Sequence, residues 1–300
     1  LKAAASASLW PPKRTQIAAN LPIEPCEFCG SPAGLDEHHT IWECPEILKQ
    51  VPENILNTTA HLLPQARSLA CPAYTHRGIT PNHLIHIPPT PVSENIQYKG
   101  DISFPPGLTI YLDGSGGFYS SDTRLRRCGW AVVGQLNQPG QPTQLLWTIQ
   151  GGLIGLQTTP RAELTALHKA LQAIASHLPQ GRAEPLRICS DCKYVTEGFR
   201  KRIWRKPGRH MDLWEQISQH PRAQVRVVKV KAHATAQDLF HELITPEDFQ
   251  GNFIADRLSS QSADQAAVPV AEAEHILKQD NISNALLDRI TLTLYHTITN

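Results

Sequence analysis

The order of the sequence patterns predicts an α/β fold, built on a five-stranded mixed sheet with flanking helices. Three short apolar runs, separated by turn residues, predict strands that follow one another directly. A helix, a strand, further helices, a last strand and a last helix come next, and crossovers of this kind make neighbouring strands parallel. One half of the sheet is therefore expected to be antiparallel and the other half parallel.

The first expected strand, residues 108–113, alternates apolar and polar side chains and ends in the turn sequence GSGG. It is followed by strands expected at 128–134, 144–150, 186–190 and 225–230.

The longest expected helix begins at Thr159, which can cap it, with Pro160 at the first helical position. Its apolar residues recur at helical spacing and form the side that packs on the sheet: Leu164, Leu167, Leu171, Ile174 and Leu178. Further helical stretches are expected after Asp191, over 211–220, and from Thr245 to about residue 262.

Composition separates a folded core from less regular flanks within the 300 residues. Apolar residues are 41% and charged residues 18% of the chain, a little low for one compact domain, and much of the proline precedes residue 110. We expect a linker (1–20), a Cys/His segment (21–50), a Pro-rich linker with at most a short helix (51–104), the α/β domain (105–264) and a tail that can be helical (265–300).

Charge and cysteine content narrow the class of protein. The 28 basic and 27 acidic side chains nearly cancel, so a nucleic-acid partner has to be argued from local patches. No apolar run approaches 18 residues, so neither a membrane span nor a membrane partner is expected. Seven cysteines in a chain of this length do not form the disulfide framework of a small secreted protein, which favours an intracellular location. Because the chain begins at Leu1, we interpret it as a fragment or a processed piece.

Four carboxylates occupy positions that the pattern marks as buried. Asp113 ends the first strand, Asp191 ends the fourth, Glu163 lies on the apolar side of the long helix, and Asp256 follows two phenylalanines at helical spacing. Each alone is more often a turn residue, a cap or a partner of the helix dipole. Together they are expected to converge at the carboxyl ends of parallel strands, where mutual repulsion would make them a site for hard divalent cations.

The segments around these acids, TIYLDGSG, PRAELTAL, SDCKYV and GNFIADRLS, resemble the four motifs of ribonuclease H type 1 over residues 105–264. The resemblance implies an endonuclease that hydrolyses the RNA strand of an RNA–DNA hybrid. It implies that Asp113, Glu163, Asp191 and Asp256 hold two Mg²⁺ ions, or Mn²⁺ in their place, in a two-metal hydrolysis. It also implies a catalytic role for His233, which follows the last strand.

The resemblance further implies substrate contacts from the motifs, at Ser115, Arg161 and Asn252. Thr158–Pro160 depart from the family, which often has Asn or Gln just before the RAE motif. The stretch 234–249 is longer than expected for the family, and could hold His233 away from the site or act as a lid.

A basic stretch lies between two of the expected helices. Residues 200–209, RKRIWRKPGR, contain six basic side chains and no acid. The family often has a basic, Trp-containing handle at this place that grips the DNA strand through phosphate contacts. The expected contacts are Arg202, Trp204, Arg205 and Lys206, while Trp214 is expected in the core.

The sequence Cys26-x2-Cys29-x9-His39-x4-Cys44 has the ligand spacing of a structural zinc site. So short a segment cannot fold by apolar burial alone, and a metal would supply its stability. His38 is the rival ligand, and His39 is preferred because of its spacing to Cys44. Cys189 and Cys192 are interpreted as packed thiols.

The Cys/His segment resembles the CCHC segment of reverse transcriptases from non-long-terminal-repeat retrotransposons. This resemblance implies the C-terminal part of a retroelement polyprotein, present in the nucleus or the cytoplasm, whose zinc knuckle can contact other nucleic acid. Two alternatives stay open: a degenerate remnant that binds hybrids without cleaving them, and a DNA-acting nuclease of the same broad fold. The presence of all four acids favours the active enzyme.

Overall fold

The computed structural model describes residues 11–138, 140–178, 184–205, 208–220 and 224–299. The chain divides into two compact units, one made of Leu1–Ile87 with Val270–Asn300 and the other of Pro88–Pro269. Among the described residues, we find no helix with the length and apolar character needed to cross a membrane.

The second unit contains a six-stranded mixed sheet with the strand order β1-β4-β3-β2-β5-β6. The strands β2, β3 and β4 pair in antiparallel fashion, whereas β5 is parallel to β2 and to β6. The expected mixed sheet is confirmed. The strands are β1 (Gln97–Lys99), β2 (Leu108–Ser115), β3 (Gly129–Leu136), β4 (Gln144–Gly152), β5 (Leu186–Ser190) and β6 (Val225–Lys229).

The expected number of strands, five, was wrong by one. The additional strand β1 lies within the stretch 51–104 that was expected to be a linker, and pairs with the edge of β4. All three of its residues are exposed. Its order therefore comes from backbone pairing, and it has no apolar pattern by which the sequence could reveal it.

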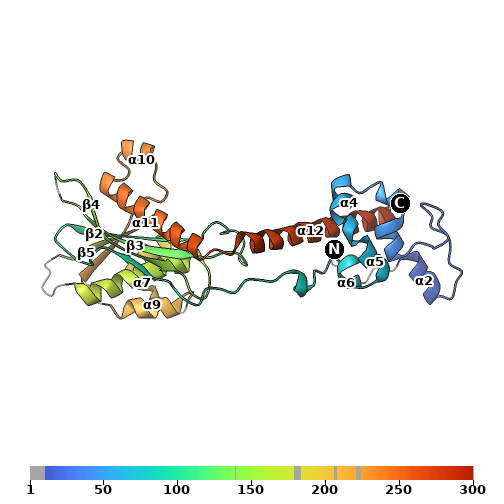
Figure 1. Ribbon diagram of the computed structural model, residues 1–300, viewed down its shortest axis with the longest axis horizontal. Coiled ribbons are helices and arrows are strands. Elements are labelled where there is room, and N and C mark those ends of the chain that lie inside the picture. Colours follow the sequence, from blue (N-terminus) through green and yellow to red (C-terminus); the bar gives the residue numbers. More distant parts are fainter. Residues whose placement is uncertain (1–10, 139, 179–183, 206–207, 221–223, 300) are drawn as a thin grey trace. The chain divides into compact units, whose positions relative to one another are not determined.

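Helices cover both faces of the sheet. α7 (Thr159–His177) and α9 (Met211–Ser218) lie on one side and α11 (Pro246–Gln265) on the other (Figure 1). The side chains of β2 alternate between the two faces, with Ile110 in the core under α7 and Tyr111 in the core under α11. Two more helices are α8 (Lys193–Lys201), which precedes the 3-10 turn η4 (Ile203–Arg205), and α10 (Ala236–Phe240).

The helix α11 packs on the sheet through small and polar residues. A Cβ added to Gly251 would lie 2.3 Å from ring carbons of Tyr111, so the helix backbone passes directly over that ring. The phenylalanines before Asp256 led us to expect a buried apolar face on this helix. That expectation was wrong, because Phe253 is 56% exposed. The residues that α11 buries are Asp248, Gly251, Asn252, Ala255, Ser259, Ser262 and Ala263.

A partly buried ion pair fixes the start of α11. Arg187 of β5 donates to both carboxylate oxygens of Asp248 (2.6 and 2.8 Å), and the Tyr111 hydroxyl donates to the same carboxylate at 2.9 Å. Burial alone would raise the pKa of Asp248, but the hydrogen bonds and charge of Arg187 hold it below its usual value. The carboxylate thus stays ionised, and the helix that carries Asp256 is anchored two turns before that residue.

The first unit is helical and combines both ends of the chain. The last helix, α12, runs beside α4 and carries Ile282, Leu286 and Ile290 into a core with Trp42 (Figure 1). Its helices and short turns are α2 (Pro12–Ala18), η1 (His39–Glu43), α3 (Pro45–Leu48), α4 (Glu53–Thr59), η2 (Ala60–Leu62), α5 (Leu63–Ser68), α6 (Pro72–Thr75), η3 (Asn82–Leu84) and α12 (Val270–Thr299).

Two segments expected to be linkers thus differ from the sequence prediction. Within 51–104 three short helices form, and within 1–20 the described part contains α2. Proline occupies one of the first two positions of α2, α5 and α6, where it favours a helix start. The tail at 265–300 forms α12, in line with its expected helical character.

Candidate active site and metal centre

Three of the four predicted acids converge at one edge of the sheet. β2 and β5 are parallel neighbours, with Leu112 opposite Ser190, so Asp113 and Asp191 come together at the ends of these strands. Glu163 comes from the first turns of α7 and faces them. Ligand oxygens of Asp113, Glu163 and Asp191 all lie within 4.8 Å of one another.

The close approach of α7 to β2 depends on a glycine. A Cβ on Gly114 would lie 2.4 Å from the backbone nitrogen of Glu163, so a larger residue next to Asp113 would push the two acids apart. Both of these acids are 6% exposed. The hydroxyl of Ser259, on α11, donates a hydrogen bond to the Asp113 carboxylate. The acid cluster is thereby connected to the helix on the face of the sheet opposite α7.

Burial and mutual repulsion perturb the ionisation of the cluster. Burial, with the added charges of Asp191 and Asp256, raises the pKa of Asp113 to about 7, although the hydrogen bond from Ser259 opposes this rise. Burial and the charge of Asp113 raise the pKa of Glu163 well above its usual value. One oxygen of Glu163 is buried and has no hydrogen-bond partner among the described residues. The donors and the excess negative charge fit a hard divalent cation.

Asp256 lies at the rim of this cluster. It is exposed and is not among the three acids whose oxygens lie within 4.8 Å, but its charge contributes to the raised pKa of both Asp113 and Glu163. A small hollow connects Asp256 to Asp191, His233 and Asn252. The fourth acid therefore faces the site from α11 across a solvent-accessible space.

His233 belongs to the same hollow, in the loop between β6 and α10. Its backbone is in the left-handed region (φ 47°) and its side chain is exposed. Burial raises the pKa of Asp191, while a hydrogen bond from Asn252 and the charge of His233 oppose that rise. The extended stretch 234–249 contains the short α10, and it leaves His233 beside Asp191.

The other residues predicted to contact nucleic acid are spread around the acids. Ser115 lies 3.2 Å from the hydroxyl of Ser260 on α11. Arg161 donates to Asp212 of α9 (Nη1 to Oδ1, 3.0 Å). Asn252 is buried, and its Oδ1 has no hydrogen-bond partner among the described residues.

The basic stretch begins in the last turn of α8. Arg202 is exposed and ends that helix in the left-handed conformation (φ 54°). Trp204 is partly buried, with its ring centre 5.9 Å from that of Trp214. Trp214 is fully buried, so its expected place in the core is confirmed. The side chain of Arg205 and all of Lys206 lie outside the described residues.

Sequence reasoning missed two residues that support the site. Ser259 orients Asp113, and Asp248 anchors α11 through Arg187. Ser259 follows Asp256 by three residues, which places both toward the same end of β2, but helical spacing alone cannot show that a serine meets a carboxylate 146 residues away.

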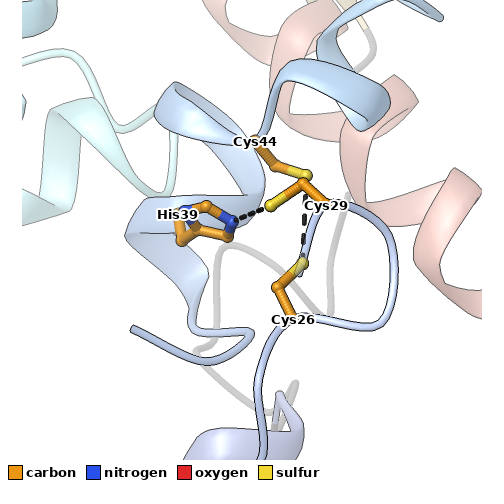
Figure 2. Close-up of side chains that lie close together, drawn as sticks. All are labelled: Cys26, Cys29, His39 and Cys44. Atoms are coloured by element: carbon orange, nitrogen blue, oxygen red, sulfur yellow. Dashed lines mark hydrogen bonds between the residues drawn. The ribbon is translucent and has the colours of Figure 1, made fainter. Parts of the chain in front are cut away.

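A second cluster contains the four predicted zinc ligands (Figure 2). The thiols of Cys26 and Cys44 are 3.9 Å apart, and the Cys29 sulfur is 3.3 Å from Nε2 of His39. Ligands at zinc–sulfur distances of ~2.3 Å in a tetrahedron are separated by about 3.8 Å, so the donor set and its spacing fit Zn²⁺. Burial raises the pKa of the Cys44 thiol to about 11, so a bound cation is needed to hold it as a thiolate at neutral pH.

The rival ligand His38 faces other side chains. Its Nδ1 is 3.2 Å from Nε2 of His76, and its Nε2 is 3.3 Å from a carboxylate oxygen of Glu43.

Of the other cysteines, Cys189 is fully buried in the core under α11, and Cys192 is partly buried against the core under α7.

Sequence comparison relates the α/β domain to a known protein family. Residues 105–264 match the family model described as RNase H. No curated protein sequence matches the chain. Similar solved structures include the RNase H domain of PFV (23% identity, 53% of this chain and 95% of that chain, TM-score 0.42). Another is the protease–reverse transcriptase of prototype foamy virus (23% identity, 58% of this chain and 22% of that chain, TM-score 0.41). A third is LC11-RNase H1 in complex with an RNA/DNA hybrid (15% identity, 53% and 98%, TM-score 0.34).

Proposed function

Because the chain belongs to the RNase H family through residues 105–264, we propose that it hydrolyses the RNA strand of RNA–DNA hybrids. The observation that carries this proposal is the convergence of Asp113, Glu163 and Asp191, buried or half-buried, around a space of a few ångströms. Three carboxylates held so closely, with no basic side chain among the donors, suit divalent cations and little else.

The metal chemistry is that of two-ion phosphodiester hydrolysis. Two Mg²⁺ ions, or Mn²⁺ in their place, would supply an activated water and stabilise the leaving oxygen of the RNA strand. Asp113, Glu163, Asp191 and Asp256 are the proposed ligands. Ser259 and Asn252 fix two of these carboxylates by hydrogen bonds, so that their oxygens keep one orientation.

His233 has the position of a proton carrier. Its ring is exposed to solvent and lines the hollow with Asp191 and Asp256. An imidazole at the edge of the site can take up a proton released during hydrolysis and pass it to water.

The cellular context proposed here is a retroelement polyprotein, in the nucleus or the cytoplasm. The Cys/His segment supports it, since a structural zinc site at Cys26, Cys29, His39 and Cys44 precedes the nuclease domain in the chain. Contacts of this zinc site with other nucleic acid belong to the same proposal.

The proposal is tested with the purified full chain and Mg²⁺ on three substrates of one sequence: RNA–DNA hybrid, double-stranded RNA and double-stranded DNA. We expect cleavage of the RNA strand in the hybrid and none without a divalent cation. Hybrid binding without cleavage would identify a degenerate remnant, and cleavage of double-stranded DNA would identify a DNA-acting nuclease. Either result would contradict the proposal.

The basic stretch is expected to bind the hybrid without taking part in chemistry. Changing Arg202, Arg205 and Lys206 to Ala should weaken hybrid binding for all sequences. It should also flatten the dependence of log Kd on log salt by roughly one unit for each lost phosphate contact. Turnover at saturating substrate should change much less, because none of these residues is among the proposed metal ligands.

A matched control removes three exposed lysines elsewhere, Lys49, Lys99 and Lys278, with the same change in net charge. This control should leave the salt dependence nearly unchanged. An unchanged salt slope with a collapsed turnover rate in the Arg202, Arg205 and Lys206 variant would show that the stretch shapes the active site instead.

A further inference from the structure

The segment between two of the proposed zinc ligands is a single π-helical turn, η1. The amide of Cys44 donates to the carbonyl of His39 at 2.8 Å, so the two residues are joined by an i→i+5 hydrogen bond. At the start of the turn, the carboxylate of Asp36 accepts from the His39 amide at 2.7 Å. Because such a bond closes the backbone between His39 and Cys44, the turn fixes the spacing of these two ligands.

The residues inside this turn pack away from the thiols, against the C-terminal helix. Ile41 is fully buried and Trp42 is 3% exposed, and both belong to a core with Leu286 and Ile290 of α12. The indole nitrogen of Trp42 donates to the carbonyl of Thr75 at 3.1 Å. The ligand-bearing turn is thus held on its second side by residues more than 200 positions later in the chain.

Arg289 of α12 makes the polar contacts at this junction. Its Nε donates to the carbonyl of Ile41 at 2.9 Å, and its Nη1 donates to the hydroxyl of Thr59 at 2.9 Å. The guanidinium carbon lies 4.2 Å from the centre of the Trp42 ring, a cation–π contact.

The environment of Arg289 is unusual for a charged side chain. It is only 5% exposed, and among the described residues no carboxylate forms an ion pair with it. A buried charge without a carboxylate is costly unless hydrogen bonds compensate. Its position inside the unit is therefore stable only while Ile41, Trp42 and Thr59 keep their places, so the arginine and the π-helical turn stabilise each other.

We propose that Arg289 is a positioning residue for the zinc site, and that zinc affinity at Cys26, Cys29, His39 and Cys44 depends on the docking of α12. The inference rests on the zinc ligands proposed above. Residues that orient a metal-bearing segment from outside the ligand set typically change metal affinity about 10- to 100-fold. By linkage, zinc binding must stabilise the docked α12 by the same factor.

The chain order gives this coupling a consequence for the nuclease domain. The second unit, Pro88–Pro269, lies in the sequence between the two parts of the first unit. When zinc is bound, the first unit therefore holds together the two chain segments that flank the nuclease domain in the sequence. Zinc would then serve the purpose that a disulfide serves in other proteins.

The first test compares zinc affinity of full-length variants by competition with a chromophoric chelator. Arg289→Met keeps the length of the side chain and removes its hydrogen bonds, and zinc affinity should fall about 10- to 100-fold. Lys278→Met removes an exposed cation from the same helix and should leave the affinity unchanged. An Arg289→Met affinity equal to that of the wild type would overturn the proposal.

The second test uses only the wild-type chain, so it does not depend on how a variant folds. Removal of zinc should lower the hydrogen-exchange protection of α12 amides between Ile282 and Thr293, and leave the amides of β2 and β5 protected. Unchanged protection of α12 in a chain that binds zinc would refute the coupling alone. A wild-type chain that binds no zinc would refute the zinc site and the coupling together.

Discussion

Asp113→Asn is expected to abolish cleavage of the hybrid. The substitution removes a ligand charge from the centre of the acid cluster and keeps the size of the side chain. A metal ion supplies several kcal/mol of transition-state stabilisation, so losing its binding should reduce turnover by about 10³-fold or more. The measurement is the initial rate of hybrid cleavage at saturating Mg²⁺.

The same variant should be at least as stable as the wild type when metal is absent. The pKa of Asp113 is about 7 in the folded chain, raised from 3.8 by burial and by the neighbouring acids. When the pKa of an acid is higher in the folded chain than in the unfolded chain, its ionisation destabilises the folded state. This destabilisation grows as the pH rises from the pKa in the unfolded chain to the pKa in the folded chain, and it is complete above the latter. With a metal chelator present, Asp113→Asn should therefore raise the free energy of unfolding above that of the wild type. This gain should be absent near pH 3, grow between pH 4 and pH 7, and reach about 2 to 4 kcal/mol.

The control for both measurements is Asp264→Asn, which removes an exposed carboxylate from the last turns of α11. It should change neither the cleavage rate nor the pH dependence of stability. Near-normal turnover in Asp113→Asn would disprove the metal-binding role of the cluster. A stability gain that does not grow with pH would show that the buried charge of Asp113 is compensated in some other way.

The convergence of the acids could be predicted because it follows from topology. Once Asp113 and Asp191 are recognised at the ends of two parallel strands, the ends must meet if the strands are neighbours. The placement of Asp256 was harder, since the phenylalanines near it suggested a buried apolar face. α11 instead buries glycine, alanine and serine over Tyr111, because a close helix–sheet contact requires small side chains.

The first unit shows what a sequence pattern cannot reveal. Its short helices have too few residues for a clear apolar period, and their prolines resemble those of a linker. Their apolar side chains find their partners on α12, and a contact such as Arg289 with Ile41 spans 248 residues. Local spacing predicted the zinc ligands within the first 50 residues, but not the distant helix that completes their surroundings.

Cys29→Ala is expected to remove zinc from the full chain. The Cys29 sulfur is 3.3 Å from Nε2 of His39 and is one of the four clustered donors, so its loss opens one corner of the proposed tetrahedron (Figure 2). Structural zinc sites contribute on the order of 10 kcal/mol or more to folding. The first unit should therefore lose its zinc-dependent unfolding transition, while the sheet of the second unit, which has its own core, should unfold as before.

Three further substitutions decide whether this loss is specific to the ligand set. Cys71→Ala changes another partly buried cysteine of the same unit, outside the cluster, and should keep one zinc per chain. His39→Ala should lose zinc and His38→Ala should retain it, because His38 faces His76 and Glu43. Metal content is measured after dialysis, and the unfolding transitions are followed with and without chelator. Equal zinc content in wild type and Cys29→Ala would eliminate the site, whereas retention in His39→Ala with loss in His38→Ala would reassign its fourth ligand.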